Sequence, residues 1–122
     1  MCTVYTISQN EGFLDAFDTF LSSFGIPSQL FSTAESFWST SVSTASGCIV
    51  TEAELPGLNG IELTRRLRAC EYVIPVLLLS INPTPEYTRL ALKAGVTTVL
   101  EKPFINAAVI TFFQQNCKSH SG

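Results

Sequence analysis

The chain has 122 residues, of which 46% are hydrophobic and 14% charged, and its formal net charge is −3. This composition is too apolar for a disordered segment, and the length fits one domain over residues 1–122. The sequence contains no lysine- and arginine-rich run that would bind nucleic acid, and no apolar run near the roughly 20 residues that cross a bilayer. We therefore expect a cytoplasmic protein that contacts neither nucleic acid nor membrane directly.

The cysteines give no metal-binding pattern. Cys2, Cys48, Cys70 and Cys117 lie far apart, and the sequence has one histidine. Zinc sites usually combine closely spaced cysteine pairs with further cysteines or histidines, so we expect no such site. Cys48 lies in an apolar run, which favours a buried and reduced thiol.

The first 25 residues predict a strand followed by a helix. The β-branched and aromatic run at residues 2–8 predicts the strand, and Asn10 can cap a helix that ends near Gly25. One apolar stripe is expected on this helix, formed by Phe13, Leu14, Phe17, Phe20, Leu21 and Phe24.

A short strand at residues 28–31 comes next. Ser32 can cap a second helix, because Glu35 follows at the capping-box spacing, and Trp38 on this helix is expected to be half-buried. A third strand runs from residue 48 into Thr51 and Glu52, and a third helix is predicted over residues 61–70.

The rest of the chain continues the alternation. The nearly continuous apolar run at residues 74–80 is typical of a strand covered by helices on both faces of its sheet. A fourth helix begins near Pro83 and Pro85 and ends at Gly95, a fifth strand covers residues 96–101, and Asn106 can cap a last helix. Five strand–helix units predict a doubly wound α/β domain with a parallel sheet, whose functional crevice lies at the carboxyl ends of the strands.

Four segments resemble the receiver domains of bacterial response regulators, and most closely the nitrogen-fixation regulator (FixJ-like) subgroup. They are FSTAESFW (31–38), CIVTEAELPGLNGIEL (48–63), IPVLLLS (74–80) and ALKAGVTTVLEKPF (91–104). The resemblance covers nearly the whole chain. It implies a flavodoxin-like (βα)5 fold of three layers, with a five-stranded parallel sheet in the order 2-1-3-4-5. It also implies a non-enzymatic module of two-component phosphorelay signalling and transcription regulation.

The resemblance assigns roles to six positions. Glu52 is equivalent to the phospho-accepting aspartate, Ser8 and Gln9 to the acidic pair that holds magnesium, Ser80 to the switch hydroxyl, Lys102 to the phosphate-binding lysine and Val99 to the aromatic switch. Ser8 and Gln9 are neutral, and glutamate is one methylene longer than aspartate. We therefore expect weak or no magnesium binding, no other cofactor and no conventional aspartyl phosphorylation, as in a pseudo-receiver.

Two interpretations of Glu52 stay open. Paired with Lys102 and near Ser80, it could imitate a phosphorylated state and fix an active-like conformation. Alternatively, Glu52 and Lys102 form an ordinary, partly exposed ion pair worth about 0–1 kcal/mol. The expected partners are proteins: a histidine kinase, an effector or a second receiver. A homodimer would use the face of the fourth helix, fifth strand and fifth helix, with Tyr87, Arg89, Lys93, Glu101 and Lys118 as its polar residues.

The sequence leaves two other functions open. The domain could be a true switch that is phosphorylated by an unusual route on Ser8 or Thr51 and controls a transcriptional output domain. It could also be a small hydrolase with Glu52 and Glu54 facing one site, although no nucleophile with an adjacent base accompanies them.

Overall fold

The computed structural model describes residues 2–40, 47–103 and 106–116. Strands and helices alternate along the chain in the order β1 (Thr3–Ile7), α1 (Glu11–Ser22), β2 (Ser28–Phe31), α2 (Ala34–Trp38), β3 (Gly47–Glu52), α3 (Gly60–Ala69), β4 (Val76–Ser80), α4 (Pro85–Ala94), β5 (Thr98–Glu101) and α5 (Asn106–Asn116). The strands form one parallel sheet in the order β2-β1-β3-β4-β5, which confirms the predicted fold.

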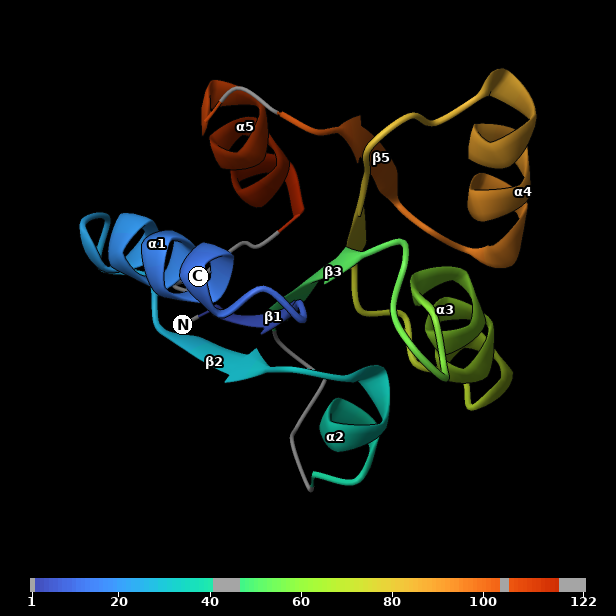
Figure 1. The fold of residues 1–122 in the computed structure, drawn as a ribbon, viewed down its shortest axis with the longest axis horizontal. Helices are drawn as coiled ribbons and strands as arrows, with labels where there is room; N and C mark the ends of the chain where they lie inside the picture. Colours follow the sequence, from blue (N-terminus) through green and yellow to red (C-terminus); the bar gives the residue numbers. More distant parts are fainter. Residues whose placement is uncertain (1, 41–46, 104–105, 117–122) are drawn as a thin grey trace.

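Helices cover both faces of the sheet, and each face has its own hydrophobic cluster. Figure 1 shows α1 and α5 on one face and α2, α3 and α4 on the other. Side chains alternate between the two faces along each strand. Accordingly, Val4, Cys48 and Val50 pack with α1 and α5, whereas Tyr5 and Ile49 pack with the other three helices. The same alternation determines toward which face of the sheet the last residue of each strand points.

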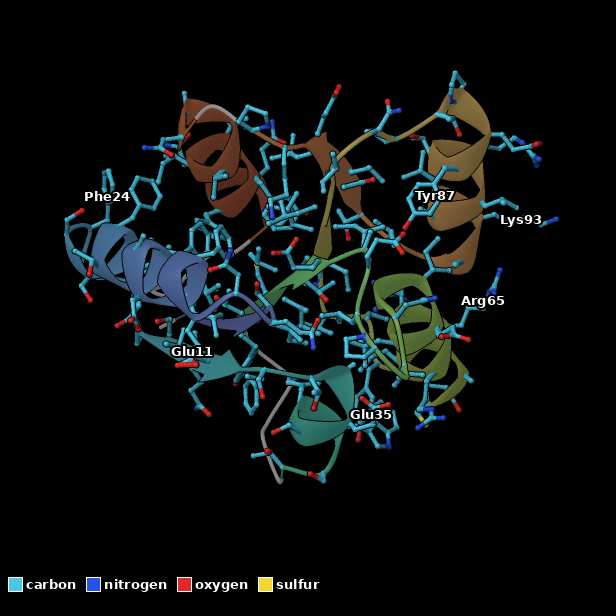
Figure 2. The ribbon with its side chains drawn as sticks, in the orientation of Figure 1. Glu11, Phe24, Glu35, Arg65, Tyr87 and Lys93 are labelled. Atoms are coloured by element: carbon cyan, nitrogen blue, oxygen red, sulfur yellow. The ribbon has the colours of Figure 1, made fainter. Side chains whose placement is uncertain are left out.

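The first helix ends earlier than the sequence predicts. Asn10 caps it as expected, and its side chain accepts a hydrogen bond from the Phe13 backbone N–H at 3.0 Å. The helix stops at Ser22, however, and Gly25 forms a turn with a φ of 71°. Phe24 therefore lies outside the helix, and 56% of it is exposed (Figure 2). The prediction that Phe24 belongs to the buried stripe is wrong.

The cap of α2 also differs from the prediction. Thr33, and not Ser32, accepts the hydrogen bond from the Ser36 backbone N–H. Glu35 makes no capping box, because Ser36 stands three residues after Thr33. The Oε2 atom of Glu35 accepts a hydrogen bond at 2.7 Å from the backbone N–H of Leu58, in the loop that joins β3 to α3. Trp38 is half-buried, as predicted, and the Arg66 guanidinium lies 5.5 Å above its ring.

The remaining boundaries shift by one or two residues. A capping box of Asn59 and Glu62 starts α3 at Gly60, and Gly95 ends α4 in the left-handed conformation, as predicted. β5 begins at Thr98, two residues later than expected, and α5 includes Asn106 as its first residue. Within the described residues, none of the helices has the length and apolarity needed to span a membrane.

Candidate functional site

The strand ends bring four of the predicted site residues to one edge of the sheet. β1 and β3 run side by side, with Ile7 opposite Thr51, so Ser8 comes next to Glu52. β4 and β5 run beside them, and the Lys102 backbone N–H donates to the Ser80 carbonyl oxygen at 2.8 Å. The topology alone therefore gathers Ser8, Glu52, Ser80 and Lys102.

An ion pair occupies the centre of the site. Lys102 Nζ lies 2.9 Å from Glu52 Oε1 and 3.0 Å from Glu52 Oε2, so the ammonium group donates to both carboxylate oxygens. The Lys102 side chain is 26% exposed and the Glu52 side chain is 14% exposed. A pair this sheltered is screened less by solvent than a surface pair, and losing one partner would leave a charge partly buried.

Ser8 completes the coordination of the carboxylate. Its hydroxyl is fully buried, donates to Glu52 Oε2 at 2.8 Å and accepts from the backbone N–H of Asn10 at 3.1 Å. Gln9, the second position of the acidic pair, is exposed. In the part of the chain that the structure describes, no three His, Cys, Asp or Glu residues group closely enough to hold a metal ion.

Ser80 lies across a cleft from this group. The cleft measures about 170 Å³, opens at the ends of β1, β3 and β4, and is lined among others by Ser8, Glu52, Ser80 and Ile81. No hydrogen bond between the described Ser80 and Glu52 side chains is present. The carboxylate oxygens accept hydrogen bonds from Ser8 and Lys102, while Glu52 and Ser80 line the same cleft.

Val99 and Tyr87 pack against the same core cluster, between the sheet and α4. Tyr87 lies on the inner side of its helix, whereas Lys93 points outward (Figure 2). Burial raises the pKa of the Tyr87 phenol, and the nearby Glu54 carboxylate raises it further. Tyr87 therefore belongs more to the interior than to the polar surface predicted for it, while Arg89, Lys93 and Glu101 are exposed. Lys118 lies outside the described residues.

Phe13 is a site residue that the sequence did not predict. Lys102 Nζ lies 5.2 Å from the centre of the Phe13 ring, within the range of a cation–π contact. Phe13 was predicted only as part of the apolar stripe of its helix, and it does pack against that cluster. The one available signal was its position three residues after the helix cap, which places it at the carboxyl edge of the sheet.

The two other functions find little support in the geometry. Ser8 and Thr51 are both fully buried, so a kinase could reach neither hydroxyl in this conformation. β3 ends at Glu52, and Glu54 lies in the following loop, so the shared strand side assumed for a carboxylate pair does not arise. Both glutamates nevertheless line the cleft.

Comparison with known proteins identifies the family of this fold. Residues 4–114 match the family model of the response regulator receiver domain. The chain is 32% identical over 101 residues to the transcriptional regulatory protein FixJ of Bradyrhizobium diazoefficiens, a match that covers 83% of this chain and 49% of FixJ. It is 26% identical over 101 residues to the response regulator protein TodT of Pseudomonas putida, covering 83% and 44%.

Solved structures agree. The crystal structure of FixJ-N superimposes with a TM-score of 0.83 at 25% identity, covering 94% of this chain and 92% of that one. The response regulator StyR gives a TM-score of 0.85 at 28% identity, covering 94% and 58%. The chain belongs to the response regulator receiver domain family, whose members act in two-component signal transduction. It spans about half the length of the curated relatives it matches.

Proposed function

We propose that this receiver domain signals through protein contacts, without magnesium-dependent phosphorylation at the position of the acceptor aspartate. The observation that carries the proposal is the engagement of Glu52, whose two carboxylate oxygens accept hydrogen bonds from Ser8 and Lys102. Attack on a phosphoryl group requires a free carboxylate oxygen in line with it. Oε2 accepts from both Ser8 and Lys102, and Oε1 accepts from Lys102, so a phosphoryl group would compete with these donors for the carboxylate.

The residues at the strand ends fit magnesium poorly. Magnesium prefers near-octahedral oxygen ligands at about 2.1 Å and usually one or two carboxylates. Ser8 supplies a hydroxyl that is already bonded on both sides, Gln9 supplies a neutral amide, and the Glu52 carboxylate is balanced by Lys102. A dication would have to compete with the lysine ammonium for one carboxylate, so we expect weak or no binding.

The test is a ¹⁵N–¹H NMR titration with magnesium, followed by beryllofluoride as a phosphoryl mimic. We expect no saturable shift at Ser8, Glu52, Ser80 or Lys102, and no phosphorylated species in mass spectra after incubation with a small-molecule phosphodonor. Saturable shifts that spread from these residues would overturn the proposal.

A gain-of-function variant provides the matched control. Ser8→Asp/Gln9→Asp/Glu52→Asp restores three carboxylates at the strand ends, and we expect it to bind magnesium under the conditions in which the native domain does not. If the variant folds and binds magnesium, the side chains at these positions account for the difference. A native domain that binds as tightly as the variant would contradict the proposal.

The partners we propose follow from the family and from the relatives' length. Receiver domains contact histidine kinases and effector domains, and in relatives such as FixJ, which are transcriptional regulatory proteins, the matched segment covers about half of the protein. We propose that the domain acts on a transcriptional output domain, by forming a dimer through α4, β5 and α5. Leu90 and Leu92 of α4 are 40% and 49% exposed and lie on different sides of the helix, so each offers an apolar contact for such a surface.

The dimer is tested by sedimentation equilibrium over a range of protein concentrations. Leu90→Glu and Leu92→Glu, made singly, each place a charge on a different side of α4, and the variant whose residue lies in the interface should shift the equilibrium to monomers. Leu30→Glu is the control, because Leu30 is 37% exposed on β2, at the opposite edge of the sheet. If neither α4 variant exceeds the effect of Leu30→Glu, this surface is not the interface.

A further inference from the structure

A closed circuit of contacts joins the ion pair to the first turn of α1. Lys102 donates to Glu52, and Ser8 donates to Glu52 and accepts from the backbone N–H of Asn10. The Asn10 side chain then caps α1 by accepting from the Phe13 N–H at 3.0 Å. The Phe13 ring closes the circuit, because it lies against Lys102 Nζ.

The Phe13 ring determines where the lysine ammonium can go. Two of the directions available to Nζ lead to the Glu52 oxygens, and the aromatic ring covers a third side at 5.2 Å. The negative face of an aromatic ring attracts a cation, and the attraction increases as water is excluded. Since three-quarters of the Lys102 side chain is sheltered, the ring holds the ammonium beside β1 and β3.

Glu52 and Ser80 line the same cleft, but they continue opposite faces of the sheet. Glu52 continues the side of β3 that carries Cys48 and Val50, which pack with α1 and α5. Ser80 continues the side of β4 that carries Val76 and Leu78, which pack with α2, α3 and α4. Among the described residues, the direct bond between the circuit and Ser80 is the backbone bond from Lys102 N–H.

We infer that Phe13 is a positioning residue for Lys102, and that the charge of Glu52 acts on the N-terminus of α1 more than on α4. This inference rests on the proposed function and specifies how its site is regulated. The Ser8 hydroxyl donates a charge-assisted bond to the carboxylate, which makes its oxygen a better acceptor for Asn10. Neutralising Glu52 weakens that link and loosens the cap, so the helix start reports the state of the ion pair.

Two equivalent backbone amides test this route, which runs from Glu52 through Ser8 and Asn10 to the start of α1. The Phe13 N–H bonds to the Asn10 cap of α1, and the Tyr87 N–H bonds to the Thr84 cap of α4, both at 3.0 Å. In Glu52→Gln and in Ser8→Ala, hydrogen exchange at Phe13 should accelerate by roughly fivefold, the size of a lost cap bond, while exchange at Tyr87 stays unchanged. Unchanged exchange at Phe13 in Glu52→Gln, or an equal acceleration at Tyr87, would overturn the route.

Ring currents test the role of Phe13. A phenyl ring above the ammonium displaces the Lys102 ε-proton resonances upfield, and Phe13→Leu should return them to the position of an exposed lysine. Phe13→Tyr keeps the ring and should retain the displacement. Phe20→Leu is the matched control, because Phe20 lies on the same helix and stacks on Phe17. Lysine resonances that are the same in Phe13→Leu and the native domain would overturn the positioning role.

These outcomes are independent of phosphorylation. If the native domain binds magnesium and beryllofluoride, the proposed function fails, whereas the lysine resonances and the two amides can still follow the inferred route. If the amides do not respond but no phosphoryl mimic binds, the route fails and the proposed function stands.

Discussion

The Arg68 side chain of α3 binds the carbonyl oxygen of Gly95, the residue that ends α4. Its Nε and Nη2 atoms donate to this oxygen at 3.2 and 2.9 Å, and its Nη1 atom donates to the Tyr72 carbonyl oxygen at 2.8 Å. Burial lowers the pKa of this guanidinium. The arginine therefore joins the ends of α3 and α4.

Replacing Arg68 should destabilise the domain. Arg68→Ala removes three charge-assisted bonds and leaves the Gly95 carbonyl without this donor, so we expect a loss of about 1–3 kcal/mol in the free energy of unfolding. Urea denaturation measures it. The control is Arg65→Ala, because Arg65 is exposed on the same helix, and its effect should stay within about 0.5 kcal/mol. Similar losses in both variants would contradict this role.

The bond between Glu35 and Leu58 predicts a dependence of stability on pH. The Leu58 N–H is the main reason why the pKa of Glu35 lies below its ordinary value of 4.5. The carboxylate therefore contributes stability above pH 4.5 and loses the contribution as the pH falls through the lower, folded pKa. We expect Glu35→Gln to be less stable than the native domain at pH 7.

The two proteins should converge in stability at the acid end of this range. Thermal unfolding between pH 3 and 7 provides the comparison, and a difference that persists at low pH would exclude the charge as its source. Gly57 provides a second variant, because a Cβ there would meet the Glu35 carboxylate and Gly57 has a φ of 73°. Gly57→Ala should destabilise the domain at every pH.

Thr6 carries a buried hydroxyl without a hydrogen-bond partner. Thr6→Val replaces it by a methyl group of similar size, so we expect a gain of about 1 kcal/mol in the free energy of unfolding. Thr64 is the matched control, because its hydroxyl is also buried but donates to the Gly60 carbonyl oxygen at 2.9 Å. Thr64→Val should be destabilising. If both variants change the free energy of unfolding in the same direction, the hydroxyl groups are not the cause.

Cys48 and Cys70 should differ in reactivity. Both are free thiols, but Cys48 is buried and its burial raises the pKa to about 12, whereas Cys70 is exposed. At pH 8 the thiolate of Cys48 is rare and inaccessible, so alkylation should reach Cys70 at least about tenfold faster. Peptide mapping by mass spectrometry measures both rates. In denaturant the rates should converge, and equal rates in the native domain would contradict the burial of Cys48.

The sequence predicted the fold well because each strand and helix carries its own local pattern. The apolar runs around Cys48 and Leu78 identify the central strands, and Gly95 and Asn10 mark helix ends by conformation and capping. Strict alternation then leaves few topologies. The errors lie where two residues compete for one role. Ser32 and Thr33 are adjacent possible caps, and the structure uses Thr33, while Glu35 bonds to Leu58 in a distant loop.

The site was predicted in position but not in contacts. The strand register brings the backbones of Ser8, Glu52, Ser80 and Lys102 to one edge of the sheet, independently of their side-chain conformations. Topology was therefore sufficient to predict where they lie. The direction of the Glu52 carboxylate depends on which donors surround it, and Ser8 lies 44 residues away in the sequence. The same holds for Arg68 and Gly95, which are 27 residues apart. Patterns of three or four residues cannot report such contacts.

The position of β1 between β2 and β3 has a consequence for the way the chain matures during synthesis. As the polypeptide leaves the ribosome, β1 meets β2 early, but its other edge stays unpaired until β3 has emerged. Closing so long a loop costs entropy that is recovered only when the distant strand docks. A nascent chain that stops before Glu52 therefore exposes one edge of β1 to other chains. The hydrogen bond between Ser8 and Glu52 can form only after β3 has paired with that edge.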